Sequence, residues 1–129
     1  MRILVDTQCW IWMTASPERF SRRARALVEA TEHDLYLSAA SSWEISIKYS
    51  IGKLRLPEPP ELYVPARMEA TRVRAFPIDH AHALRVGLLP PHHRDPFDRM
   101  LVAQAQVERL TLLTPIRFQA PRLPPRYAS

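Results

Sequence analysis

Short apolar runs that alternate with helix-like segments constrain the fold of this chain most strongly. The first run, Ile3-Leu4-Val5, stops at Asp6, which is typical of a buried parallel strand. Similar runs lie at 35–37, 73–78 and 110–114, and helices are expected at 8–13, 21–31, 61–71, 79–86 and 95–109. Ser21 and Asp79 could cap the helices that they begin, and Asp95 followed by Pro96 is a strong helix start. Strands that alternate with helices predict an α/β fold with a parallel sheet.

One segment, 43–51, fits two structures. Its apolar residues alternate strictly with polar residues, which is the period of a strand. However, Ser41 and Glu44 have the spacing of a helical capping box, and Gly52 could close a helix. The periodicity favours a strand, whereas the capping signals slightly favour a helix.

Composition indicates one domain over residues 1–129, with a proline-rich tail at 118–129 in which no regular structure is expected. The chain is 47% hydrophobic and has one cysteine, which excludes an internal disulfide. No apolar run approaches the roughly 20 residues of a membrane span, and the opening residues lack the apolar core of a signal peptide. We therefore expect a soluble, cytoplasmic protein without a membrane partner. The net charge of +5 fits either a nucleic-acid partner or simple solubility.

Four carboxylates lie at expected junctions between strands and helices: Asp6, Glu44, Asp95 and Asp98. In a parallel sheet they would lie at one edge, where oxygen ligands suit Mg²⁺ or Mn²⁺. Each could instead cap a helix, because acidic side chains are favoured in a first helical turn. The residues alone leave these two interpretations open.

Three longer motifs resemble those of PIN-domain nucleases, in the same order and across nearly the whole chain. They are residues 1–7, residues 38–48 with 52–54, and residues 91–105; the run 110–114 resembles the strand that follows them. Together they are similar to the VapC type of toxin from bacterial toxin–antitoxin pairs. The resemblance implies a three-layer α/β/α fold with a central parallel sheet of four or five strands, and it implies a helix over 43–51.

The resemblance also implies a function, that of a Mg²⁺- or Mn²⁺-dependent endoribonuclease. Asp6, Glu44 and Asp98 match the metal-binding acids, and Asp95 is a further acid beside them. Residues that would contact RNA are Thr7, His93, Arg94, Arg99 and Thr114. Ile116 stands where family members often carry another acid, which bears on a second metal.

An antitoxin and a second copy of the chain, forming a homodimer, are the protein partners that the resemblance implies. Candidates for the antitoxin contact are Trp10, Trp12, Met13 and Tyr49, with core burial as the alternative for most of them. Two other functions remain open: a PIN-like module that binds RNA or protein without cutting, and a phospho-acceptor domain.

Overall fold

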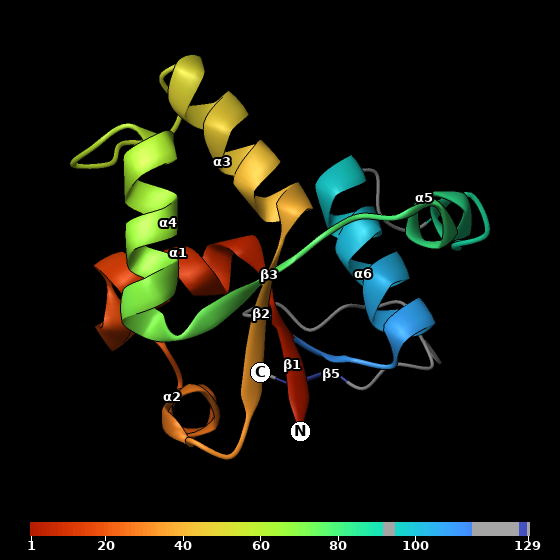
Figure 1. Cartoon of the computed structure of the whole chain (residues 1–129), viewed down its shortest axis with the longest axis horizontal. Coiled ribbons are helices and arrows are strands. Elements are labelled where there is room, and N and C mark those ends of the chain that lie inside the picture. Colours follow the sequence, from red (N-terminus) through yellow and green to blue (C-terminus); the bar gives the residue numbers. More distant parts are fainter. Residues whose placement is uncertain (92–94, 115–126, 129) are drawn as a thin grey trace.

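A parallel sheet of five strands forms the centre of the computed structural model, which describes residues 1–91, 95–114 and 127–128. The strands are β1 (Arg2–Val5), β2 (Asp34–Ser38), β3 (Val73–Phe76), β4 (Thr111–Leu113) and β5 (Tyr127–Ala128). Their order across the sheet is β3-β2-β1-β4-β5, and every neighbouring pair is parallel (Figure 1). The predicted parallel α/β sheet is confirmed.

Helices cover both faces of this sheet (Figure 1). They are α1 (Thr7–Ala15), a 3-10 turn η1 (Pro17–Arg19), α2 (Arg22–Glu29), α3 (Ala39–Ser50), α4 (Pro60–Thr71), α5 (His80–Val86) and α6 (Pro96–Glu108). Because successive side chains of a strand point to opposite faces, β1 supplies both layers of the core. Ile3 and Val5 pack with residues of α1, α2 and α4, whereas Leu4 packs with α6. The predicted three-layer architecture follows from these two clusters.

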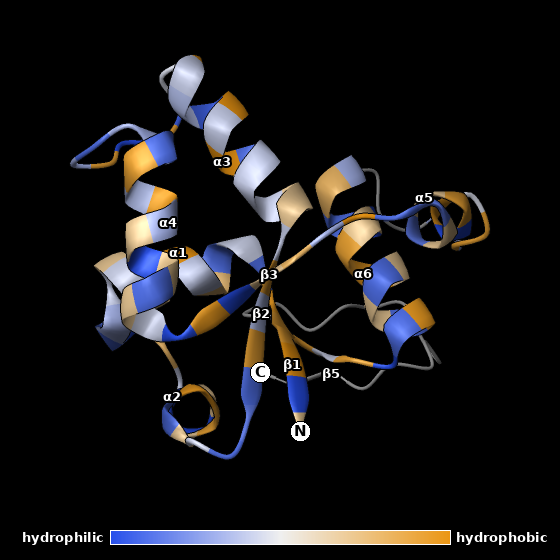
Figure 2. Ribbon diagram, viewed as in Figure 1, coloured by the Kyte–Doolittle hydropathy of each residue, from blue (hydrophilic) through white to orange (hydrophobic). Residues whose placement is uncertain are grey.

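Buried apolar residues explain the position of β1 between the two helical layers. Ile3, Leu4 and Val5 are fully buried, and Figure 2 shows hydrophobic residues along this strand beyond Arg2. Burial of an aliphatic side chain contributes roughly 1.5 to 3 kcal/mol each. Burial on both faces therefore holds the carboxyl end of β1, and the residue that follows it, in a fixed position.

The ambiguous segment is helical, but its capping signal was misplaced. Ser38, the last residue of β2, caps α3 by accepting a hydrogen bond from the Ala40 amide at 3.0 Å. Ser41 lies inside the helix and is fully buried, so the predicted capping box from Ser41 to Glu44 is wrong. The helix starts earlier because β2 runs directly into it.

The end of the chain also differs from the prediction. No regular structure was expected among its prolines, yet Tyr127–Ala128 pairs with Leu112 and Leu113 of β4. This short strand lies at the edge of the sheet, where only one side needs a hydrogen-bonding partner. Ile116 lies outside the described residues, as do His93 and Arg94.

Among the described residues, no helix combines the length and the apolar composition needed to cross a membrane.

Candidate functional site

Asp6 connects the central strand to the first helix. Its Oδ1 accepts hydrogen bonds from the amides of Gln8 at 2.8 Å and Cys9 at 3.2 Å, so it is the N-cap of α1. Its own amide donates to the Leu113 carbonyl of β4 at 2.9 Å. Burial raises the pKa of Asp6 to about 6, with further increases from Glu44 and Asp95 and opposing decreases from the two amide hydrogen bonds. Asp6 therefore caps α1, but its ionised form is destabilised by burial in the folded protein.

Glu44 lies in the second turn of α3 and is 6% exposed. Its Oε2 accepts a hydrogen bond from the Lys48 ammonium at 2.6 Å. Its Oε1 is buried and has no hydrogen-bonding partner among the described residues. A buried carboxylate oxygen without a partner destabilises a fold by about 1–3 kcal/mol or more. The position of Oε1 is therefore better explained by a ligand that binds it than by a purely structural role.

Asp95 and Asp98 begin α6. Asp95 is the N-cap, and its Oδ1 accepts from the amides of Phe97 at 2.8 Å and Asp98 at 3.1 Å. The predicted cap at Asp95, with Pro96 in the first helical turn, is confirmed. Partial burial raises the pKa of Asp98 to about 7, and the neighbouring charges of Asp95, Asp6 and Glu44 add to this effect, while Lys48 opposes it.

These four acids share one electrostatic neighbourhood, which we call the acidic cluster: Asp6, Glu44, Asp95 and Asp98. The pKa of Asp98 responds to the other three acids, which come from α3, from the N-cap of α6 and from the residue that follows β1. Figure 1 shows why, since α1, α3 and α6 all begin near the same edge of the sheet. Like charges gathered in a partly buried region are what a bound cation would stabilise.

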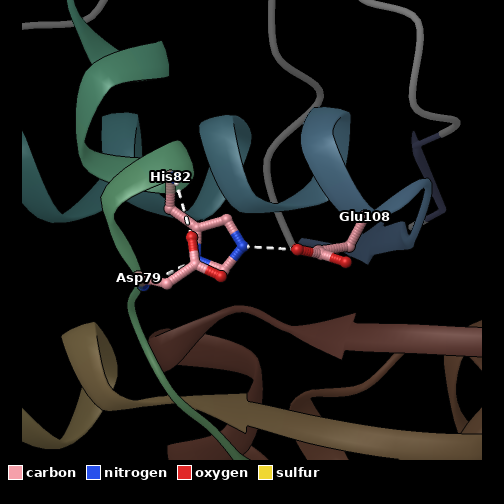
Figure 3. Close-up of side chains that lie close together, drawn as sticks. All are labelled: Asp79, His82 and Glu108. Atoms are coloured by element: carbon pink, nitrogen blue, oxygen red, sulfur yellow. Dashed lines mark hydrogen bonds and ion pairs between the residues drawn. The ribbon is translucent and has the colours of Figure 1, made fainter.

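A second group of possible metal ligands lies where α5 meets the end of α6. Atoms of Asp79, His82 and Glu108 lie within 4.8 Å of one another (Figure 3), so this cluster could also hold a metal. In the geometry shown, the His82 Nε2 lies 2.7 Å from Glu108 Oε2, and Nδ1 accepts from the Asp79 amide at 3.1 Å. Both ring nitrogens are therefore engaged, and 2.7 Å is a hydrogen-bond distance rather than the wider spacing of two ligands around an ion.

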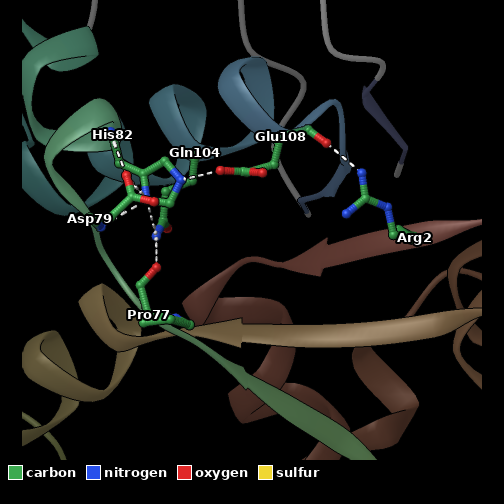
Figure 4. A network of polar contacts seen from close by, with 6 residues as sticks. All are labelled: Arg2, Pro77, Asp79, His82, Gln104 and Glu108. Atoms are coloured by element: carbon green, nitrogen blue, oxygen red, sulfur yellow. Dashed lines mark hydrogen bonds and ion pairs between the residues drawn. The ribbon is translucent and has the colours of Figure 1, made fainter.

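This second group instead joins helices to the sheet (Figure 4). Asp79 and His82 form a capping box at the start of α5, and Glu108 lies at the end of α6. The main-chain carbonyl of Glu108 accepts a hydrogen bond from Arg2 of β1, and Gln104 donates to the Pro77 carbonyl at 3.2 Å. The sequence predicted the Asp79 cap but missed His82, whose position three residues after the cap was the available signal.

The polar residues expected beside the acids have different surroundings. The Thr7 hydroxyl donates to the Ser41 hydroxyl at 2.7 Å in a buried contact between α1 and α3. Thr114 is 2% exposed and directly follows β4. Arg99 donates to the carbonyls of Val86 at 2.9 Å and Pro90 at 3.0 Å, a structural contact that the sequence did not suggest.

The aromatic residues separate into core and surface. Trp10 is fully buried and packs edge-on against Tyr63 with ring centroids 6.3 Å apart, so it is unavailable for an antitoxin contact. Trp12, Met13 and Tyr49 are half-buried. Trp43 is 58% exposed and packs against Phe97, and it begins an exposed apolar row on α3. That row consists of Trp43, Ile47 and the C-cap residue Ile51, none of which was among the predicted antitoxin contacts.

Known proteins resemble this chain in both sequence and fold. Ribonuclease VapC16 of Mycobacterium tuberculosis (strain ATCC 25618 / H37Rv) is 44% identical over 75 residues, which is 53% of this chain and 53% of the relative. The chain thus aligns with about half the length of that relative.

Solved structures match over a larger share. DNA-bound VapBC from Salmonella typhimurium superimposes with a TM-score of 0.72 at 18% identity, covering 99% of this chain and 97% of that one. VapBC2 from Rickettsia felis, bound to a DNA fragment from its promoter, gives 0.70 at 15% identity, covering 98% and 96%. At such identities these structures support the fold alone. The family model described as the PIN domain matches residues 3–115, and the chain therefore belongs to the PIN domain family.

Proposed function

We propose that this protein is a metal-dependent endoribonuclease that acts as the toxin of a toxin–antitoxin pair. Its divalent ion, Mg²⁺ or Mn²⁺, would be held by Asp6, Glu44 and Asp98, with Asp95 beside them. The observation that carries the proposal is the buried, unpaired Oε1 of Glu44 within the acidic cluster. The naming of the relative from M. tuberculosis as a ribonuclease supports the same activity.

The acids of the cluster have different surroundings and would therefore have different roles. Asp6 is held rigidly by two amides, so its carboxylate presents a fixed ligand direction. Asp98, whose pKa is about 7 without an ion, would give up its proton when the ion binds. When bound, the ion would supply an acidified water and neutralise charge on the scissile phosphate.

Residues around the cluster would receive the RNA. We assign this role to Thr7 and Thr114 beside the acids, to Arg99 in the first turn of α6, and to His93 and Arg94, which lie outside the described residues. Since Arg99 holds the carbonyls of residues 86 and 90, it would also support the segment that leads to His93 and Arg94. The excess of arginine suits phosphate contacts.

We propose further that the protein is one domain over residues 1–129, acts in the cytoplasm, forms a homodimer and is held by an antitoxin. The structures of VapBC and of a toxin–antitoxin complex from Klebsiella pneumoniae support an antitoxin partner. Exposed apolar residues on α3 and half-buried ones on α1 offer contact surface, in particular Trp43, Ile47, Trp12 and Met13.

Cleavage of RNA with and without metal tests the activity. We expect the purified, antitoxin-free protein to cut RNA in Mg²⁺ or Mn²⁺ and to lose this activity in EDTA. Asp98→Asn should abolish cleavage, whereas Asp34→Asn, an exposed acid at the opposite end of β2, should retain it. RNA binding without cleavage under any metal would instead support the non-catalytic alternative, which the isoleucine at position 116 favours.

A further inference from the structure

Lys48 makes a contact with the acidic cluster that the proposed reaction does not use. It lies one helical turn after Glu44 on α3, and its Nζ is 2.6 Å from Glu44 Oε2. Many pairs at this spacing are fully exposed and contribute little. Here the glutamate side chain is only 8% exposed, so the ammonium contacts a carboxylate that is largely shielded from water.

The charge of Lys48 also acts beyond its own helix. Lys48 interacts electrostatically with Asp95 and Asp98, which belong to α6 and its cap, as well as with Glu44. Its ammonium therefore offsets part of the repulsion among carboxylates that come from two different helices. A positive charge in this place has the same electrostatic effect as a bound cation.

The two oxygens of Glu44 differ, and the difference limits what Lys48 can do. Oε2 is used by the ammonium, whereas Oε1 is buried without a partner in the described part of the chain. A divalent ion that binds either oxygen of this carboxylate would lie about 2 Å from that oxygen, and thus at most about 7 Å from the ammonium. The side chain of Lys48 is 46% exposed, so its ammonium can leave Oε2 for solvent without passing through the core.

We propose that Lys48 is a tethered counter-cation, which occupies Glu44 in the metal-free protein and competes with the divalent ion for it. The inference rests on the proposed metal site and adds a determinant of its affinity. Lys48 would thereby keep the metal-free cluster folded and at the same time weaken metal binding.

Coulomb's law sets the expected size of the effect. A single and a double positive charge about 6 Å apart repel each other enough to weaken binding about tenfold, even at the dielectric constant of water. A lysine that merely orients Glu44 for the ion has the opposite consequence, since its removal would weaken metal binding. The direction of the change therefore separates competition from orientation.

Titration with Mn²⁺ by calorimetry tests the proposal at pH 8, where Asp98 is mostly ionised. Lys48→Met keeps the apolar length of the side chain without its charge, and should bind Mn²⁺ about tenfold more tightly than the wild type. Lys48→Arg keeps the charge and should bind as weakly as the wild type. Lys53→Met is the matched control at the other lysine, an exposed one, and should leave affinity unchanged.

Circular dichroism establishes that each variant is folded, and Lys48→Gln provides a second neutral side chain if Lys48→Met is not. Equal or weaker Mn²⁺ binding by the neutral variants would overturn the competition while leaving the metal site intact. Absence of Mn²⁺ binding in every protein, including the wild type, would overturn the proposed metal site and this inference with it.

Discussion

Replacing Asp98 by Asn should make the metal-free protein more stable at alkaline pH. The carboxyl group lies in the first turn of α6, where partial burial and three neighbouring acids raise its pKa from 3.8 to about 7. The folded protein therefore holds a proton on Asp98 at pH values where the unfolded chain has released it. Stability falls as pH rises from about 4 to 7 and stays reduced above that range, because ionised Asp98 is unfavourable in the fold.

The size of this penalty follows from the pKa shift. A rise of about three units corresponds to about 4 kcal/mol, at roughly 1.4 kcal/mol for each unit. Because the Asp98 side chain is partly exposed, solvent screening reduces the penalty, and we expect about 2 to 3 kcal/mol. An asparagine cannot ionise, so Asp98→Asn should gain this amount at pH 8 and almost nothing at pH 4.

Urea unfolding in EDTA at both pH values measures the difference. Asp34→Asn is the control, because Asp34 is 51% exposed and lies 3.9 Å from Arg74 at the other end of β2. Its free energy of unfolding should change by less than about 0.5 kcal/mol at either pH. An Asp98→Asn variant that is no more stable than the wild type at pH 8, or equally stabilised at both pH values, would refute the reasoning.

Two further substitutions test neighbouring contacts. Asp95→Ser retains a side chain that can cap α6 but removes a charge, so the pKa of Asp98 should fall, as followed by carboxyl-carbon NMR. Glu108→Leu leaves the buried Nε2 of His82 without its partner at 2.7 Å, which should lower the free energy of unfolding by about 2 kcal/mol in urea titrations; an unchanged value would mean that water replaces the carboxylate.

Local signals were sufficient to predict most of the fold. The capping residues Ser21, Asp79 and Asp95 were all identified from the sequence, because a cap depends on neighbours two or three residues away. The strand that ends at Asp6 was also identified, since a short apolar run before a polar residue is a local feature. The family resemblance supplied the three-layer arrangement, which such signals leave open.

The sequence was hardest to interpret in α3, where apolar residues are exposed and polar residues are buried. The apolar residues Trp43 and Ile47 of α3 and its C-cap Ile51 are exposed, while the polar residues Ser41 and Glu44 are buried. A helix with polar groups inside gives a misleading periodicity, and such exceptions are expected near functional sites. The periodicity of this segment therefore favoured a strand, the capping signals only slightly favoured a helix, and the resemblance to a known motif implied the helix that the structure shows.

Contacts between residues far apart in the sequence could not be predicted from local sequence patterns. His82 pairs with Glu108 twenty-six residues later, and Thr7 with Ser41 thirty-four residues later. The same limit applies to the acidic cluster, whose shared electrostatics depend on how α3 and α6 meet the sheet edge. The sequence could supply the candidate acids, whereas their mutual effect on pKa required the fold.

The strand order has a consequence for synthesis on the ribosome. The first strand to emerge is the central one, and Ile3 must pair on one side with Leu35 and on the other with Thr111. A nascent chain shorter than about residue 111 therefore leaves one edge of β1 open to other partners. Since Asp6 precedes Asp98 by most of the chain, a truncated product that ends before α6 has neither a closed sheet nor a complete set of acids.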